Sequence, residues 1–384
     1  MKVSVLKCDQ YDLELLKAKI EYSLKLINCD EIIKPNDRVF IKLNCLGPFD
    51  KEAGITTHPV FVQAVIQIVK KYTNNIIVGD NPATKNLIPT MKKNGIYDVL
   101  IAEGVEIIDG KKSINIKTEN YTLFNAFDVS EEMINVDVMI NLPKLKTHSL
   151  TYMTGAQKNL FGFIYGLSKA GWHVRASNPL QFGEALNDLY AAILDAYKDK
   201  TIIHLCDGIL GLEGEGPGIS GNPKYANVIL ASQDAISLDR VAVEVVDLDY
   251  DRLFVNRIGN ERKLGIGDLG KIEILGDGLD AFTDLHFVAP KNTLSIFGLR
   301  LLKIKWLRNI VLEHPHINNN KCIKCGECAK ICSSKAMTIE QKSFPKVKKN
   351  ICIRCWCCSE VCPQDAISKT ARPLIGKILL KNRN

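Results

Sequence analysis

The sequence has 384 residues, of which 46% are hydrophobic and 24% are charged. This composition is typical of a globular chain and excludes a disordered or fibrous one, and the length predicts more than one domain. No apolar run approaches the ~18–20 residues that cross a bilayer, and the apolar stretch after Met1 is too short for a signal peptide. We therefore expect a cytoplasmic protein without a transmembrane segment.

The net charge of +7 is distributed unevenly along the chain. Residues 291–384 contain 19 Lys and Arg against 5 Asp and Glu, a net +14, so residues 1–290 carry the opposite sign. A basic segment invites a nucleic-acid interpretation, but this one lacks the known binding motifs, and we expect no nucleic-acid partner. A face that attracts an acidic electron-carrier protein and a merely solvated surface are the two interpretations that we keep.

Residues 1–290 alternate between segments of helical periodicity and short β-branched runs. Helices are predicted over four segments: Leu13–Ile27, Pro59–Tyr72, Leu180–Tyr197 and Ala235–Val246. Strands are predicted over six segments: Arg38–Leu43, Ile76–Asp80, Val136–Leu142, Thr201–Cys206, Ala226–Ala231 and Lys271–Leu275. Such alternation favours an α/β fold with a mostly parallel, layered sheet.

Polar and glycine-rich residues follow several of these predicted strands. In open α/β sheets, ligands bind outside the carboxyl ends of the strands, so we expect these residues to converge on one crevice. The candidate ligand-binding residues are Asn44, His58, Asp80, Asn159, Asp207 and Glu213. The run from Gly211 to Gly218 matches neither a phosphate loop nor a dinucleotide fingerprint, and we interpret it as a loop or lid.

Four basic residues are the candidate catalytic residues of this crevice: Lys144, Lys146, Lys158 and His148. Together with Lys42, the lysines would give the crevice a positive potential that attracts a carboxylate or a phosphate. His148 is the expected proton donor, because its usual pKa near ~6.5 suits that task at neutral pH. The alternative is that these are ordinary solvated lysines and a loop histidine.

Residues 291–314 read as a basic amphipathic connecting helix, which either packs against its own protein or lies on a membrane surface. Residues 371–384 form a similar basic tail. Between them, residues 315–370 hold nine of the thirteen cysteines of the chain. In a cytosolic protein, cysteines at this density point to metal before disulfides.

Eight of these cysteines form two runs with the same spacing, C-x2-C-x2-C-x3-C. Two such runs are the signature of a small α+β, bacterial-type ferredoxin domain with two [4Fe–4S] clusters, in which the fourth cysteine of each run binds the other cluster. The first ligand set is therefore Cys322, Cys325, Cys328 and Cys362. The second ligand set is Cys352, Cys355, Cys358 and Cys332. Zinc is the rival interpretation, because paired CxxC motifs also bind it.

Four features of the cysteine pattern fall outside these sets. Ser333 stands where the first run would carry a proline, which is not a ligand. Cys357 is spare, and we interpret it as a packing residue, with an alternate ligand or an oxidation-sensitive thiol as the other options. Cys45 and Cys206 both follow predicted strands, and we expect buried thiols there rather than a third metal site.

Several of these motifs together resemble a known family. The segments that carry the resemblance are Asn141–His148, Thr154-Gly155, Lys158-Asn159, Gly162, Gly79–Pro82, Gly54–Pro59, Asp207-Gly208 and Gly214–Pro217. They resemble, in order, the family of domain of unknown function 362, over roughly residues 1–290. A double-cluster ferredoxin domain accompanies this domain elsewhere in the family, so the resemblance implies an iron–sulfur protein and leaves the substrate open.

The sequence thus predicts four segments, 1–290, 291–314, 315–370 and 371–384, and a ferredoxin-dependent oxidoreductase. An external carrier of the ferredoxin or flavodoxin type would supply electrons for an anionic small molecule in the crevice. One alternative is a non-catalytic electron carrier or docking subunit whose α/β domain binds a partner protein. Another is that the clusters are only structural, and whether the chain is an enzyme stays open at this point.

Overall fold

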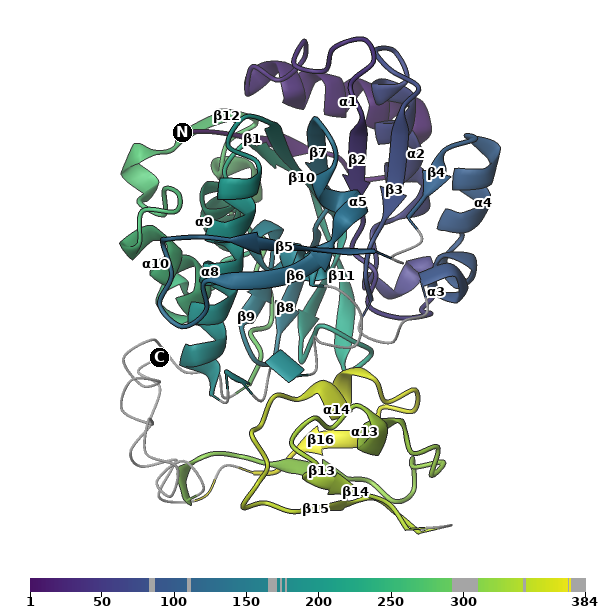
Figure 1. Cartoon of the computed structure of the whole chain (residues 1–384), viewed down its shortest axis with the longest axis vertical. Helices are drawn as coiled ribbons and strands as arrows, with labels where there is room; N and C mark the ends of the chain where they lie inside the picture. Colours follow the sequence, from purple (N-terminus) through teal and green to yellow (C-terminus); the bar gives the residue numbers. More distant parts are fainter. Residues whose placement is uncertain are drawn as a thin grey trace.

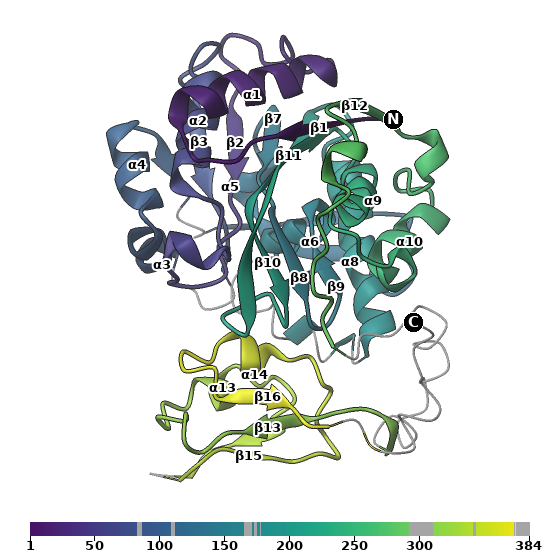
Figure 2. The same cartoon turned by 180° about the vertical axis from the view of Figure 1, so that it is seen from behind.

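The computed structural model describes residues 1–82, 87–108, 112–164, 171–172, 175–176, 178–291, 310–340, 343–371 and 373. A large α/β part is built on one sheet, and a small C-terminal part lies against one end of it (Figures 1 and 2). Most of the predicted connecting helix and basic tail lies outside the described residues. Within those ranges, no helix is long and apolar enough to cross a membrane.

The main sheet is mixed, with parallel pairs in the majority, so the predicted fold class is confirmed. Its strand order is β12 (Glu273–Gly276), β1 (Lys2–Lys7), β11 (Gly221–Ser232), β10 (Thr201–Gly214), β7 (Val138–Asn141), β2 (Val39–Lys42), β3 (Ile76–Gly79) and β4 (Glu106–Ile107). Two further strands extend it where β10 continues past β7: β8 (Lys144–His148) and β9 (Tyr152–Thr154).

Alternate residues of the central strands point to opposite faces and form two cores. Phe40 of β2 packs on the face covered by α8 (Pro179–Ala196) and α9 (Ala235–Val245), whereas Val39 and Ile41 pack on the face covered by α1 (Leu13–Leu26) and α2 (Pro59–Val69). Other α-helices whose bounds the structure describes in this part are α3 (Leu87–Asn94), α4 (Ile96–Ala102), α5 (Glu131–Ile134), α6 (Ala156–Asn159) and α10 (Phe254–Glu261). A hairpin of β5 (Ser113–Lys117) and β6 (Ala126–Ser130) crosses in front of the sheet in Figure 1.

The four long helices begin and end close to their predicted bounds because their capping signals are local. The side chains of Asp12, His58, Asn178 and Asp234 each accept a hydrogen bond from a backbone N–H in the first turn. Such N-caps satisfy donors that the helix itself leaves unpaired. Short 3-10 turns complete the chain: η1 (Lys51–Ala53), η2 (Leu160–Phe163), η3 (Tyr250–Arg252), η4 (Leu269–Lys271) and η5 (Asp280–Phe282).

One prediction about the sheet is wrong. The strand that starts at Thr201 does not end at Cys206 but continues to Gly214, so the glycine-rich run begins as a strand rather than as a loop. Gly211 and Gly214 pair with Lys224 and Gly221 of β11 in an antiparallel ladder. That ladder pairs the backbone N–H and C=O groups of this segment. In the sequence alone, its glycines indicate a turn or a lid.

The C-terminal part consists of two short antiparallel pairs and two one-turn helices. Its elements are β13 (Pro315–Ile317), α13 (Glu327–Lys330), β14 (Met337–Thr338), β15 (Lys346–Val347), α14 (Cys357–Glu360) and β16 (Ile367–Lys369). Trp356, just before α14, packs against Phe182 of α8 and Phe254 of α10. This apolar contact attaches the C-terminal part to the α/β part.

Candidate functional site

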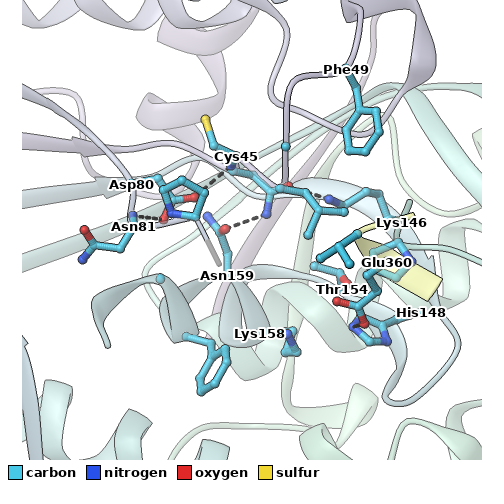
Figure 3. Close-up of a pocket in the computed structure, with 18 of the residues that line it drawn as sticks. Cys45, Phe49, Asp80, Asn81, Lys146, His148, Thr154, Lys158, Asn159 and Glu360 are labelled. Carbon is cyan, nitrogen blue, oxygen red and sulfur yellow. Dashed lines mark hydrogen bonds and ion pairs between the residues drawn. The ribbon is translucent and has the colours of Figure 1, made fainter. Parts of the chain in front are cut away.

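A cavity of about 150 Å³ lies where the carboxyl ends of β2 and β3 meet the C-terminal part. Asn44 and Cys45 follow β2, and Asp80 and Asn81 follow β3. The rest of the polar lining comes from β8, β9, α6 and α14: Lys146, His148, Thr154, Lys158, Asn159, Cys357 and Glu360. Figure 3 shows Lys146, His148 and Glu360 among the labelled side chains around the cavity. A cavity therefore lies at these strand ends, and the cysteine-rich segment contributes to its lining.

A buried polar network forms the floor of the cavity. The Lys42 ammonium lies 2.7 Å from the Asp80 carboxylate, and the other oxygen of Asp80 accepts a hydrogen bond from the Cys45 backbone N–H. The Asn159 side chain accepts a hydrogen bond from the Asn44 amide at 2.6 Å. Because every one of these groups is buried and paired, the network holds the strand ends in one arrangement.

Lys146 lies above this floor and is held by two acceptors. Its Nζ donates to Oδ1 of Asn44 and to the carbonyl oxygen of Ile55, each at 2.6 Å. Burial, together with the nearby charges of Lys158 and Lys144, lowers the pKa of Lys146 to about 7. Lys146 therefore changes its charge near neutral pH.

Lys158 and Thr154 line the cavity and have side-chain donors without a hydrogen-bond partner among the described residues. Among the described residues, the Lys158 ammonium makes no hydrogen bond or ion pair and lies over the rings of Phe161 and Phe182, 5.1 and 5.8 Å from their centroids. Burial lowers the pKa of Lys158, and the charge of Glu360 opposes that effect. Within the same described set, the buried hydroxyl of Thr154 has no partner either. Thr154 is buried and Lys158 is half-buried, and both groups suit a ligand that accepts hydrogen bonds.

His148 presents one ring nitrogen to the cavity. Its Nδ1 accepts hydrogen bonds from the backbone N–H groups of Leu150 and Thr151, which assigns the imidazole proton to Nε2. Nε2 lies 3.7 Å from Oε1 of Glu360, which the C-terminal part contributes. Burial raises the pKa of Glu360, whereas the charges of Lys158 and Lys146 lower it.

Four of the predicted residues lie outside the cavity lining. Lys144, Asp207 and His58 belong with Tyr11 to a second group, here called the sealed cluster, in which Lys144 and Asp207 are fully buried. Asp207 accepts hydrogen bonds from Lys144 at 2.7 Å, from the Tyr11 hydroxyl at 2.8 Å and from the His58 backbone N–H at 2.9 Å. His58 also stacks on the Tyr11 ring and caps α2.

The fourth residue outside the lining, Glu213, forms an ion pair with Lys224 at 3.0 Å and accepts a hydrogen bond from the Val288 backbone. Sequence reasoning assigned it to the crevice because it expected a loop where β10 continues. Conversely, it missed Thr154 and Glu360. No short-range pattern distinguishes these two, because Glu360 reaches the cavity only through the packing of the C-terminal part.

Cysteines of the two runs lie near one another in the structure. The pKa of Cys328 is raised to about 11 by burial and then by Cys325, Cys362 and Cys322, the other three of the first ligand set. The neighbours of Cys352 include Cys355 and Cys332 of the second ligand set. Eight thiols in two groups of four suit [4Fe–4S] clusters.

The backbone supports the same pairing of the two runs. Lys324 and Arg354, each just before the second cysteine of a run, both have a φ of 59°, and Lys335 and Asp365 after the fourth cysteines are also left-handed. Such conformations are uncommon for residues with side chains and recur only where the surroundings impose them. The two runs therefore wrap in the same way.

The cysteines outside the two ligand sets add no metal site among the described residues. Within the described part of the chain, no three His, Cys, Asp or Glu side chains are gathered closely enough to hold one ion. Cys45 and Cys206 cannot share a site either, because Cys45 packs in the core on one face of the sheet and Cys206 in the core on the other. Cys357 is buried and lines the cavity.

The fold and the cysteine sets define an iron–sulfur protein with an α/β domain. A family model described as 4Fe-4S binding domain matches residues 315–338. The model described as domain of unknown function (DUF362) matches residues 39–244. The chain therefore belongs to the DUF362 family.

One curated relative is the thylakoid-associated protein sll1697 of Synechocystis, which is 34% identical over 249 residues. That match covers 64% of this chain and 75% of the relative. Among solved structures, the lactate racemase apoprotein of Thermoanaerobacterium thermosaccharolyticum matches with a TM-score of 0.40 and 11% identity. This match covers 64% of this chain and 57% of that structure. A Thermotoga maritima protein matches with a TM-score of 0.33 and 10% identity over 54% of this chain and 52% of its own.

Proposed function

We propose that this protein binds two [4Fe–4S] clusters and is a ferredoxin-dependent oxidoreductase. Electrons from an external ferredoxin- or flavodoxin-type carrier would serve the reduction or oxidation of a small anion bound in the cavity. The observation that supports this most strongly is that one cavity is lined both by Lys146, Lys158 and His148 and by Cys357 and Glu360 of the cysteine-rich segment. When bound, the clusters supply single electrons.

The unpaired groups of the cavity support an anionic ligand. The Lys158 ammonium and the Thr154 hydroxyl both lack a hydrogen-bond partner among the described residues, and a carboxylate or phosphate oxygen can accept from both. Lys146 adds positive charge below pH 7, where it is protonated. A cavity of about 150 Å³ has the size that holds a benzene-sized molecule, so the ligand is small.

His148 is the residue that we assign to proton transfer. Its Nε2 carries the proton, because Nδ1 accepts backbone N–H groups, and Nε2 faces the cavity lining at Glu360. A ligand held by Lys158 and Thr154 would then share the cavity with this donor. Asp80, Asn44 and Asn159 line the cavity and would orient the ligand, and the ion pair with Lys42 holds Asp80 in place.

Anaerobic purification tests the proposal. We expect about eight irons per chain, two interacting clusters in the EPR spectrum after reduction, and a small carboxylate or phosphate compound in the mass spectrum of the extracted protein. The Lys158→Met variant should keep the iron and lose the small molecule. Once that molecule is identified, His148→Ala should abolish its turnover and leave both clusters spectroscopically intact.

Three results would contradict the proposal. About four irons per chain, or zinc in their place, would rule out two clusters. Equal amounts of the small molecule in the wild type and in Lys158→Met would remove Lys158 from the binding site. Full iron content with no bound anion, and no binding of acetate or phosphate, would favour the alternative of a non-catalytic electron carrier.

A further inference from the structure

The two cysteine runs have equal spacing but opposite surroundings. In the first run, Lys321, Ile323, Lys324 and Cys325 are all exposed, and Ile323 has 60% of its surface accessible. We call these four residues the input surface. They are nearly consecutive in the chain, so they form one patch around a cysteine of the first ligand set.

Three of the matching residues of the second run, Ile353, Arg354 and Cys355, are half-buried or buried, whereas Ile351, which matches Lys321, is exposed. Arg354 stands where the first run has Lys324, and it is buried, with its Nε donating to the carbonyl oxygen of Glu313 at 2.8 Å. Trp356, where the first run has Gly326, packs against the α/β part, and Cys357 lines the cavity. The second run therefore contributes Cys357, Glu360 and Val361 to the cavity and the first run only Ile331, while the start of the first run faces solvent.

On the basis of the proposed function, we propose that the input surface is the docking site for an acidic one-electron carrier protein. At each encounter, the reduced carrier loses one electron, and the cluster held by the first ligand set gains it, with no proton or atom exchanged. The cavity lies on the opposite, second-run side, which separates the protein partner from the small anion.

The positive surface charge of the C-terminal part favours a partner protein with a negative net charge. Exposed lysines outnumber exposed carboxylates among its described residues: Lys321, Lys324, Lys330, Lys335, Lys346, Lys348 and Lys349 against Glu327 and Glu340. A basic surface accelerates the encounter with an acidic protein and does so less at high salt. Ile323 supplies a small apolar centre inside this charged rim, which is how transient interfaces are composed.

The test uses the holoprotein and an acidic flavodoxin. We expect the variant with Lys321→Glu and Lys324→Glu to bind the flavodoxin more weakly by calorimetry. Stopped-flow reduction of this variant by reduced flavodoxin should slow about tenfold or more at low salt, and the difference from the wild type should shrink as salt rises. The single variant Lys324→Glu should show the same effect to a smaller degree, and Lys117→Glu, an exposed lysine on β5, is the matched control.

The methyl viologen radical is a small reductant that needs no protein docking site. Its reduction rate therefore tests the docking site separately from the proposed function. Both variants should keep their iron and be reduced by the viologen at an undiminished rate. Unchanged flavodoxin binding and reduction in the double variant would overturn the docking site while leaving the proposed function intact. Loss of binding to anionic lipid vesicles with an unchanged reduction rate would also overturn it, because the patch would then be a membrane contact. A wild-type protein that no one-electron donor can reduce would refute the proposed function itself.

Discussion

Strand β8 contributes basic residues both to the sealed cluster and to the cavity, and these two sites differ in whether their polar groups are paired. Lys144 belongs to the sealed cluster, where Asp207 and Tyr11 satisfy its ammonium. Lys146 and His148 lie two and four residues further along, on the same face of the strand, and line the cavity with Lys158. The sealed cluster has every charge paired, whereas the cavity keeps Lys158 and Thr154 without partners among the described residues.

This difference separates stability from binding. A paired buried charge is needed for the fold, because removing one partner leaves the other buried and unpaired. An unpaired group in a cavity costs stability, and it persists where a ligand completes it. Changes in the sealed cluster should therefore unfold the protein, and changes in the cavity should spare the fold and weaken binding.

The largest effect is expected in the sealed cluster. Asp207→Asn leaves the Lys144 ammonium buried without a carboxylate and should lower the free energy of unfolding by about 3–5 kcal/mol. Urea unfolding followed by circular dichroism measures this loss. Adding Lys144→Met to Asp207→Asn removes the stranded charge and should restore part of the stability. If Asp207→Asn lowers the free energy of unfolding by less than about 1 kcal/mol, the paired charges of the sealed cluster are not needed for the fold.

Lys158→Met should have the opposite profile. It removes a charge-assisted hydrogen bond to the ligand, worth about 1.5–3 kcal/mol, so the dissociation constant for acetate or phosphate should rise roughly ten- to a hundredfold. The free energy of unfolding should not fall, since methionine needs no partner. Lys117→Met, which changes an exposed lysine on β5, is the control and should leave the affinity unchanged. A destabilised Lys158→Met variant that retains its affinity would place Lys158 with the sealed cluster instead.

Thr154→Val should act more mildly in the same direction. Valine has nearly the same shape and lacks the hydroxyl, so the affinity for the anion should fall by about 0.5–1.5 kcal/mol. Because the hydroxyl has no partner among the described residues, the ligand-free protein should become slightly more stable. Thermal unfolding with and without acetate measures both effects, and a destabilised ligand-free variant would contradict them.

The smallest effect is a pH dependence that arises from Lys146. With a folded-state pKa of about 7 against an ordinary value near ~10.4, the unfolded chain binds more protons between these pH values, so this lysine makes stability rise with pH in that window. Anion affinity should fall over the same range as the ammonium is lost, by at most about tenfold per pH unit. Acetate suits this measurement, since its own charge is constant there. Lys146→Met should flatten the profile, and an unaltered profile would assign the titration elsewhere.

Sequence reasoning reached much of this arrangement. The helix caps at Asp12 and Asp234 are local, and the cysteine spacing specifies both ligand sets without reference to the rest of the chain. It could not distinguish the role of Lys144 from that of Lys146, because both lie on one face of β8. Only the tertiary structure brings Tyr11 and Asp207 into contact with Lys144. Glu360 was missed for a similar reason, because it meets His148 only after Trp356 packs against α8 and α10.

The central claim is that the cavity and the clusters form one functional unit. The most direct test is the EPR spectrum of the anaerobically reduced protein, recorded with and without saturating inorganic phosphate. Binding in the cavity should alter the signal of the cluster held by the second ligand set in the wild type and leave the Lys158→Met spectrum unchanged. A spectrum that does not respond, in a wild-type protein that calorimetry shows to bind phosphate, would contradict the claim.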